Sequence, residues 1–294
     1  MTRLKFKMTH DLLFKMLFVK YPDLLKRLVA VLLDIKYEAI TAFVITNPEI
    51  PPETLGDKFC RLDINMTVNG QRVDIEVQVE NEGNYPERSL FMWAKEFSTG
   101  IAIGEDYKKL PRTIIISILG FNQFADESKY HHEFQCLEVT THQPLTDKMV
   151  LHFYELNKLP PLAEDDNNDK DLWLQLFRAE TEEDLAAIEQ LEVPIMSEAL
   201  QAYRHVTASD EFKERERLWA KARHDEAQAL ANAALKGAIE ERKHWHGIVA
   251  DKDILLADKD MLLADKDVMI ANKDVLIEKL MTQLAQKQQA SLKN

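Results

Sequence analysis

An Asn69-Gly70 pair separates two stretches of alternating apolar and polar residues, and no other feature constrains the fold as strongly. Asn-Gly between two such stretches is typical of a two-residue type I′ turn, which joins the antiparallel strands of a β-hairpin. A turn at this position also sets which residues face each other across the two strands. The sequence therefore predicts a hairpin over residues 58–80 with three opposed pairs on one face, namely Asp63 with Glu76, Asn65 with Asp74, and Arg61 with Gln78.

The two faces of this hairpin differ in polarity. One face is apolar and is expected to contact the core; its residues are Leu62, Ile64, Met66, Val73, Ile75, Val77 and Val79. The other face gathers acids, and like charges directly opposed in a sheet are destabilising unless a cation, a raised pKa or full solvation relieves them. Hard divalent cations prefer carboxylate oxygens, so we expect Mg²⁺ or Mn²⁺ at this face. A solvated polar sheet face is the simpler alternative, but the hairpin lies in the middle of a segment whose sheet we expect to be covered on both sides.

Composition and charge restrict the partners of the chain. The net charge is −13, yet residues 1–120 contain 16 basic and 16 acidic residues, so the acidic excess lies in the remainder. This segment does not repel phosphate, but it is no basic DNA clamp either. Cys60 and Cys136 are expected to be buried thiols in a reducing cytoplasm. We expect no signal peptide, because the N-terminal residues lack an uncharged apolar region, and no membrane span, because no apolar run is long enough.

Helix and strand patterns around the hairpin predict an α/β domain with a mixed sheet. A helix over residues 86–104, ended by Gly104, precedes a β-branched run at residues 112–120, so we expect a right-handed crossover to a parallel strand buried on both faces. The other expected elements are helices from Thr9 or Asp11 to Leu33 with a break at Tyr21-Pro22, and strands at residues 132–140 and 148–156.

The second half of the chain has a different pattern. An acidic segment follows residue 161, and the sequence beyond it is helical. From Ala250 the repeat ADKDILL occurs with three close variants, which indicates a long helix. Its apolar positions do not form a clean two-stranded seam, and a lone solvated helix would expose many aliphatic side chains. We therefore expect a homo-oligomer through this tail, and three parts in all: residues 1–160, a helical region at 161–235, and a long helix or coiled coil at 236–294.

Several motifs, taken in order, resemble one known family. These are THDLLFKMLF, the hairpin with its ExQ pattern in NGQRVDIEVQVEN, YPERSLFMWAKEFSTGI, GEDYKKLPRTIIISILGFNQF and LHFYELNK. Their order and spacing resemble the Rpn family of recombination-promoting nucleases, also described as transposases, within the PD-(D/E)xK nuclease superfamily. The resemblance covers about residues 8–160 and implies a restriction-endonuclease-like αβββαβ core, here followed by the α-helical region and the heptad-repeat helix.

The resemblance also implies a site on the hairpin. The superfamily's first acid corresponds to Asp63, its second to Glu76, and Gln78 stands where the superfamily has lysine. Asp63, Glu76 and the backbone carbonyl of Val77 would hold Mg²⁺ or Mn²⁺. Gln78 can orient water or phosphate but is neither a cation nor a base.

Four further residues are auxiliary candidates. Arg88 and Lys95 share one side of the following helix and could replace the missing cation, although an ordinary solvated helix face is the alternative. Asp74 is a ligand of a second metal, a residue that supports the metal ligands without binding the metal, or a polar strand residue. Asp11 is an auxiliary acid or, more simply, a charge that favours a helix N-terminus.

These implications favour a metal-dependent DNA endonuclease that serves recombination or mobile-element movement. One alternative is a catalytically weak nuclease-fold scaffold or regulator that acts through its tail, because the motif lacks lysine. Another is a transposase with a three-acid RNase H-like site. Such a site requires a third carboxylate on a distant helix, whereas Asp63 and Glu76 lie on one hairpin.

Overall fold

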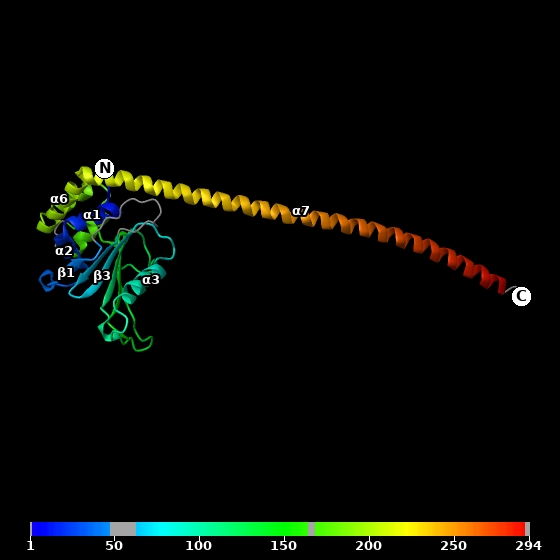
Figure 1. The fold of residues 1–294 in the computed structure, drawn as a ribbon, viewed down its shortest axis with the longest axis horizontal. Coiled ribbons are helices and arrows are strands. Elements are labelled where there is room, and N and C mark those ends of the chain that lie inside the picture. The colour runs from blue at the N-terminus through cyan, green and yellow to red at the C-terminus, as the bar shows by residue number, and fades with distance from the viewer. Residues whose placement is uncertain (1, 48–62, 164–167, 292–294) are drawn as a thin grey trace. The chain divides into compact units, whose positions relative to one another are not determined.

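Six strands form one mixed sheet with helices on both of its faces (Figure 1). The computed structural model describes residues 2–47, 63–163 and 168–291. In spatial order the strands are β1 (Phe43–Ile45), β2 (Ile64–Val68), β3 (Gln71–Gln78), β4 (Thr113–Leu119), β6 (Met149–Glu155) and β5 (His131–Gln135). The predicted α/β fold with a mixed sheet is confirmed.

The hairpin has the predicted register. β2 and β3 are antiparallel, with Asn65 opposite Asp74. Asn69 and Gly70 both have positive φ, +49° and +78°, as a type I′ turn requires. The Asn69 side chain also accepts hydrogen bonds from the backbone amides of Thr41 and Ala42 at 2.9 and 3.0 Å. This side chain therefore ties the turn to the segment that leads into β1, which pairs with β2 on the side opposite β3. The third predicted pair, Arg61 with Gln78, lies outside the described residues.

A parallel crossover follows the hairpin. β3 and β4 are parallel and are connected through α3 (Tyr85–Ser98), and β4 is also parallel to β6. All seven residues of β4 are buried, as expected for a β-branched strand covered on both faces. The expected helix to Gly104 is too long, because α3 ends at Ser98. Arg72 donates hydrogen bonds to the Glu96 and Thr99 carbonyls at the end of α3, and this satisfies groups that a longer helix would have used.

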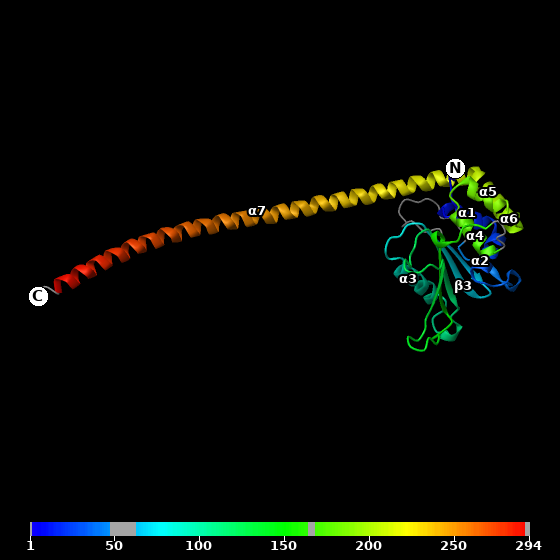
Figure 2. The same cartoon turned by 180° about the vertical axis from the view of Figure 1, so that it is seen from behind.

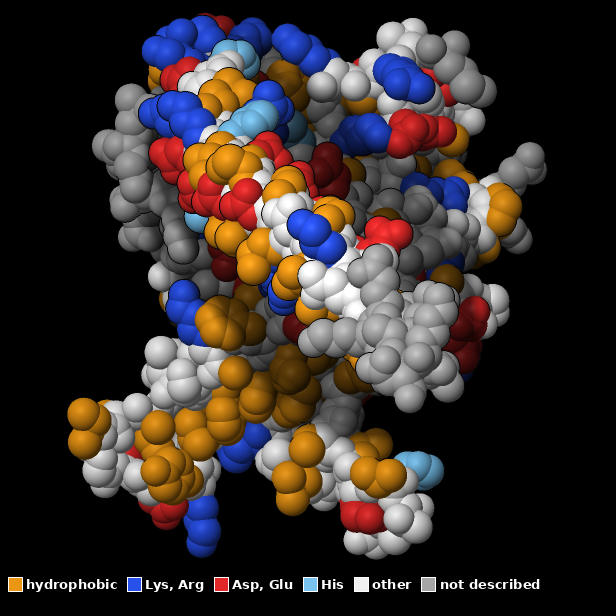
Figure 3. Space-filling view, turned by 90° about the vertical axis from the view of Figure 1, so that its right-hand side faces the viewer, with side chains coloured by type: hydrophobic (Ala, Val, Ile, Leu, Met, Phe, Trp, Pro, Cys, Tyr) orange, Lys and Arg blue, Asp and Glu red, His pale blue; other side chains and the backbone are white. Residues whose placement is uncertain are grey.

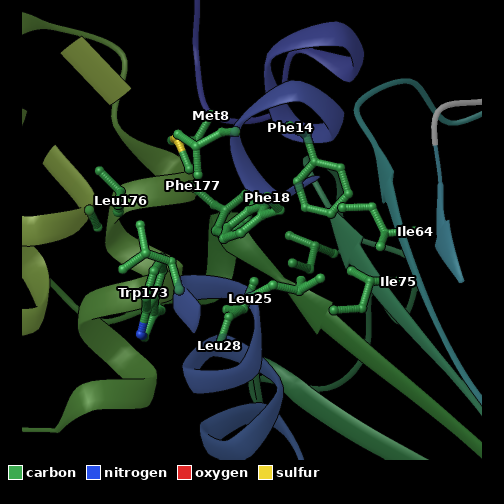
Figure 4. Close-up of a cluster of buried hydrophobic side chains, with 14 of the residues drawn as sticks. Met8, Phe14, Phe18, Leu25, Leu28, Ile64, Ile75, Trp173, Leu176 and Phe177 are labelled. Atoms are coloured by element: carbon green, nitrogen blue, oxygen red, sulfur yellow. The ribbon is translucent and has the colours of Figure 1, made fainter. Parts of the chain in front are cut away.

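One face of the sheet contacts the main hydrophobic core (Figures 2 and 4). The helices that form this core are α1 (Asp11–Lys20), α2 (Pro22–Leu32), α4 (Asp169–Arg178), α5 (Glu182–Glu189) and α6 (Pro194–Ala208). In Figure 4 the side chains of Phe14 and Phe18 lie between Trp173 on one side and Ile75 of the sheet on the other. Each large apolar side chain buried in this way contributes roughly 1.5–3 kcal/mol. The core therefore holds α1 firmly against the hairpin.

The opposite face carries α3 and a smaller apolar cluster. Because side chains alternate along a strand, Ile114, Ile116 and Ile118 of β4 contact the main core while Ile115 and Leu119 contact the smaller cluster. The same alternation on β3 directs Val73, Ile75 and Val77 to the main core. Asp74, Glu76 and Gln78 therefore face α3. The polar face of the hairpin is a covered surface, as predicted.

Several local predictions need correction. α1 begins at Asp11, one of the two expected starts, but its N-cap is His10, whose ring accepts a hydrogen bond from the Leu13 amide. Val79 lies beyond the end of β3 and is exposed, since no strand follows to bury it. The strand expected at 132–140 is β5, which ends at Gln135 and is followed by a turn.

The predicted cysteines have different outcomes. Cys136 is a free thiol, but it is only half-buried because β5 has ended before it. Cys60 lies outside the described residues.

Residues Met1–Ala222 and Arg223–Asn294 form two compact units. The second unit consists of the greater part of α7 (Asp210–Ser291), a single helix of 82 residues, so the long helix expected from the heptad repeats is confirmed. Helices α4 to α6 contribute to the same core as the sheet. The division at residues 160 and 235 stays a prediction. No helix in the described part of the chain combines the length and hydrophobicity that crossing a bilayer requires.

Candidate metal centre

Three carboxylates meet on the α3 side of the hairpin. Asp63 precedes the first residue of β2, and Asp74 and Glu76 lie two residues apart on β3. One oxygen from each lies within 4.8 Å of the others, and in the described ranges no other such group of three acids, histidines or cysteines is found. Asp74 and Glu76 are buried, 4% and 5% exposed, and Asp63 is half-buried. The strand alternation predicted from the sequence is thus what brings these acids together.

Burial disfavours the ionised forms of two of the three acids. Burial raises the pKa of Asp74 well above its usual range, and the charges of Asp63 and Glu76 raise it further. Burial also raises the pKa of Asp63, while the positive charge of Lys15 partly opposes this. A divalent cation bound to these acids would favour their ionised forms and so oppose both shifts. Three carboxylates at this spacing are a donor set that suits Mg²⁺ or Mn²⁺, and Asp63, Asp74 and Glu76 are the residues that would hold it.

Asn65 connects two of the acids. Its carboxamide, with the NH₂ group facing the carboxylates, donates to Asp74 Oδ1 at 2.5 Å and to Asp63 Oδ2 at 3.2 Å. These hydrogen bonds favour the ionised form of each acid and fix their relative orientation. On the neighbouring strand, Ser117 pairs with Glu76 in the sheet register. Its buried hydroxyl has no hydrogen-bond partner among the described residues, so this side of the cluster keeps one polar group for a ligand.

Arg88 of α3 lies over the same face. Its Nη2 donates to Glu76 Oε2 at 3.1 Å, and its Nη1 is 3.4 Å from Gln78 Oε1. The Gln78 amide in turn donates to the Glu80 carbonyl at 3.0 Å. The ExQ motif and the first turns of α3 therefore form one hydrogen-bonded network. Arg88 supplies its positive charge, because the side chain of Gln78 is neutral.

The other auxiliary candidates lie further from the acids. Lys95 is exposed on α3, and its charge is a minor influence that lowers the pKa of Asp63. Asp11 is exposed in the first turn of α1, where an acid stabilises the helix N-terminus, and it is not one of the three clustered acids. The role of the Val77 carbonyl stays a prediction.

The sequence analysis did not identify Lys15 as part of the site. This residue lies in an otherwise apolar stretch of α1 and is 2% exposed. Its Nζ donates to the Asp63 carbonyl at 2.9 Å and also to the Asn47 carbonyl. The signal that could have found it is a lysine inside a continuous apolar run, since a buried ammonium group requires specific partners.

A polar cavity of about 270 Å³ adjoins the cluster. Asp74 and Asn65 contribute to its wall, together with Arg72, Glu96 and Thr99. Arg72 is 3.7 Å from Glu96 Oε2 and donates to the Thr99 hydroxyl at 2.6 Å. The cavity provides room for a polar ligand next to the acids.

The family of the chain can now be stated. A family model described as "PD-(D/E)XK nuclease family transposase" matches residues 8–233, which is more than three-quarters of the sequence. The chain belongs to this family. No curated protein and no solved structure shows a significant match to the chain.

Proposed function

We propose that this protein is a metal-dependent DNA endonuclease that hydrolyses phosphodiester bonds and serves recombination or the movement of a mobile element. The observation that carries the proposal is the clustering of Asp63, Asp74 and Glu76 within 4.8 Å on a covered face of the sheet. Membership of a nuclease family supports the same reaction class. Mg²⁺ or Mn²⁺ is the proposed cofactor.

Each residue has a defined task in hydrolysis. The carboxylates of Asp63 and Glu76 bind the cation, with Asp74 beside them and Asn65 holding the orientation of Asp63 and Asp74. A bound Mg²⁺ or Mn²⁺ supplies Lewis-acid chemistry, because it lowers the pKa of water and offsets the charge that develops around phosphorus.

Two further residues act on the substrate. The Gln78 amide can orient the attacking water by hydrogen bonds. Arg88 is the residue we assign to the phosphate, because a guanidinium group matches two phosphate oxygens at once. Glu76 holds this guanidinium group at 3.1 Å, so Arg88 is already directed at the site.

The charge distribution is consistent with DNA binding through a few contacts at the site and not through a broad basic surface. In Figure 3, hydrophobic side chains gather in the lower part of the view. Residues 1–120 contain 16 basic and 16 acidic residues, so this segment has no excess of the positive charge that gives strong non-specific DNA binding. Affinity for DNA would therefore depend on the cation, Arg88 and other local basic residues. We expect a cytoplasmic location, as inferred from the sequence.

A second candidate function is a nuclease-fold scaffold with little activity. Gln78 in place of lysine and the ion pair of Arg88 with Glu76 favour it, because both reduce the capacity of the site for catalysis. In that case the tail, and not the hairpin, would carry the function.

Plasmid cleavage separates the two candidates. Purified full-length protein is incubated with supercoiled DNA and Mg²⁺, Mn²⁺ or EDTA, beside Glu76→Ala and the surface control Glu87→Gln. We expect metal-dependent nicking that Glu76→Ala loses and Glu87→Gln retains. Absence of cleavage with either metal would favour the scaffold, and cleavage that persists in Glu76→Ala would place the activity elsewhere.

A further inference from the structure

Lys15 lies on the far side of the sheet from α3, yet its amino group contacts the residue that begins the metal cluster. α1 packs in the main core, and Leu12 to Phe18 are all buried. A lysine ammonium in such surroundings is costly unless polar groups receive its hydrogen bonds. The carbonyls of Asp63 and Asn47 receive them. The amino group therefore connects α1, the end of the β1 segment and the start of β2.

Hydrogen bonds from Lys15 and Asn47 hold the residue that precedes β2. The ladder of β2 with β3 extends only from Ile64 to Val68, so Asp63 lies one residue outside it. Two donors bind the Asp63 carbonyl, Lys15 Nζ at 2.9 Å and Asn47 Nδ2 at 3.2 Å. Asn47 Oδ1 accepts from the Asn65 amide at 2.8 Å. Lys15 and Asn47 thus replace the hydrogen bonds that a longer strand would have provided.

The charge of the same amino group also acts on the acids. Although burial raises the pKa of both Asp63 and Asp74, the charge of Lys15 lowers them in part. The ExQ motif has no cation of its own. Lys15 is a buried lysine whose charge acts on two of the three clustered acids.

We propose that Lys15 is a positioning residue of the metal centre, which anchors the Asp63 end of β2 to α1 and supplies there a fixed positive charge that Gln78 cannot. The inference rests on the proposed function, because it assigns Asp63 as a metal ligand. It implies that α1 is part of the site, because the Lys15 side chain reaches the residue that precedes β2. A merely structural lysine would affect folding but not the affinity of folded protein for a cation.

Mn²⁺ binding to metal-stripped, full-length protein tests the proposal by calorimetry. Lys15→Met removes the donor and the charge at nearly constant length, and we expect about tenfold weaker Mn²⁺ binding, as for other residues that orient metal ligands. Lys20→Met is the matched control, because Lys20 is exposed on the same helix, and it should bind Mn²⁺ like wild type. Met16→Ala, a destabilised core variant of α1, should also keep wild-type affinity while it is folded.

Hydrogen exchange of the metal-free protein provides a second readout. Lys15→Met and Asn47→Ala should each raise the exchange rate of the Asn65 amide, whereas Lys20→Met should not. If Lys15→Met does not fold, Asn47→Ala alone tests the inference. Asn47→Ala should also weaken Mn²⁺ binding, because it removes the other donor to the Asp63 carbonyl. Wild-type Mn²⁺ affinity and exchange in these variants, or an equal loss of affinity in Met16→Ala, would overturn the inference. Wild-type protein that binds no Mn²⁺ would overturn the proposed function, while the exchange rates would still report on the anchor.

Discussion

Arg88 on α3 donates from Nη2 to Oε2 of Glu76 on β3 at 3.1 Å, so an acid assigned to bind a cation already has a cationic neighbour. Both side chains are largely buried, 17% and 6% exposed, which strengthens their attraction relative to a surface pair. A cation that binds Glu76 must compete with this guanidinium group. The pair therefore links metal binding to the position of Arg88.

The first prediction concerns this competition. Arg88→Met should bind Mn²⁺ more tightly than wild type, because Glu76 loses its competing partner, yet should cleave DNA about 10–100-fold more slowly, because the phosphate loses its cation. Calorimetry and plasmid cleavage measure the two effects. Arg27→Met is a control, since Arg27 pairs with Asp23 on α2, away from the acids. Weaker Mn²⁺ binding together with undiminished cleavage would contradict this role.

The second prediction concerns Asp63. Asp63→Ala should abolish metal-dependent cleavage but leave the protein folded, and without metal slightly more stable, because one of several repelling charges is removed. Thermal melts in EDTA and plasmid cleavage check both statements. Asp126→Ala removes an exposed acid and should change neither. Full activity of Asp63→Ala would show that the site has been assigned wrongly.

The third prediction concerns the pH dependence of stability. The pKa of Asp74 is raised in the folded protein relative to its usual value of 3.8, so ionisation of Asp74 opposes folding as the pH rises through the folded-state pKa. Asp74→Asn removes this cost and keeps the shape and an acceptor for Asn65. In EDTA it should be more stable than wild type at pH 7–8, by roughly 1–3 kcal/mol. The difference should shrink as the pH falls and vanish below about pH 3, where Asp74 is protonated in both folded and unfolded states.

Urea unfolding of wild type and Asp74→Asn between about pH 3 and pH 8 measures this difference. Asp126→Asn is the control for a general effect of one negative charge. A stability difference that does not change with pH would mean that Asp74 is not the titrating group. Added Mn²⁺ should reduce the advantage of Asp74→Asn, because it stabilises the wild-type carboxylates.

The fourth prediction concerns the tail. In the four repeats of α7, aliphatic side chains such as Leu255, Leu262 and Ile270 are more than half exposed in the single chain. Their burial against other copies would be favourable. Deletion of residues 250–294 should therefore lower the molar mass measured by light scattering, and residues 1–249 should remain folded. An unchanged mass would refute homo-oligomerisation through the repeats.

The sequence by itself determined the elements whose signals are local. The Asn69-Gly70 turn and the alternation on either side of it specify the hairpin, its register and the face that gathers Asp63, Asp74 and Glu76, because turn geometry and strand pleat act over a few residues. The β-branched run of β4 and the heptad repeats of α7 are equally local signals. The end of α3 was not predictable, because Arg72, from another strand, satisfies its last carbonyls.

Only the tertiary structure decided which cations accompany the acids. Arg88 was one of two residues compatible with helix spacing, and the packing of α3 on the sheet brought Arg88, and not Lys95, into contact with Glu76. Lys15 lies 48 residues before Asp63, and its apolar neighbours gave no indication that its amino group reaches a strand end. Such contacts depend on how α1 and the sheet pack together, which is set by the whole core and not by any short stretch of the chain.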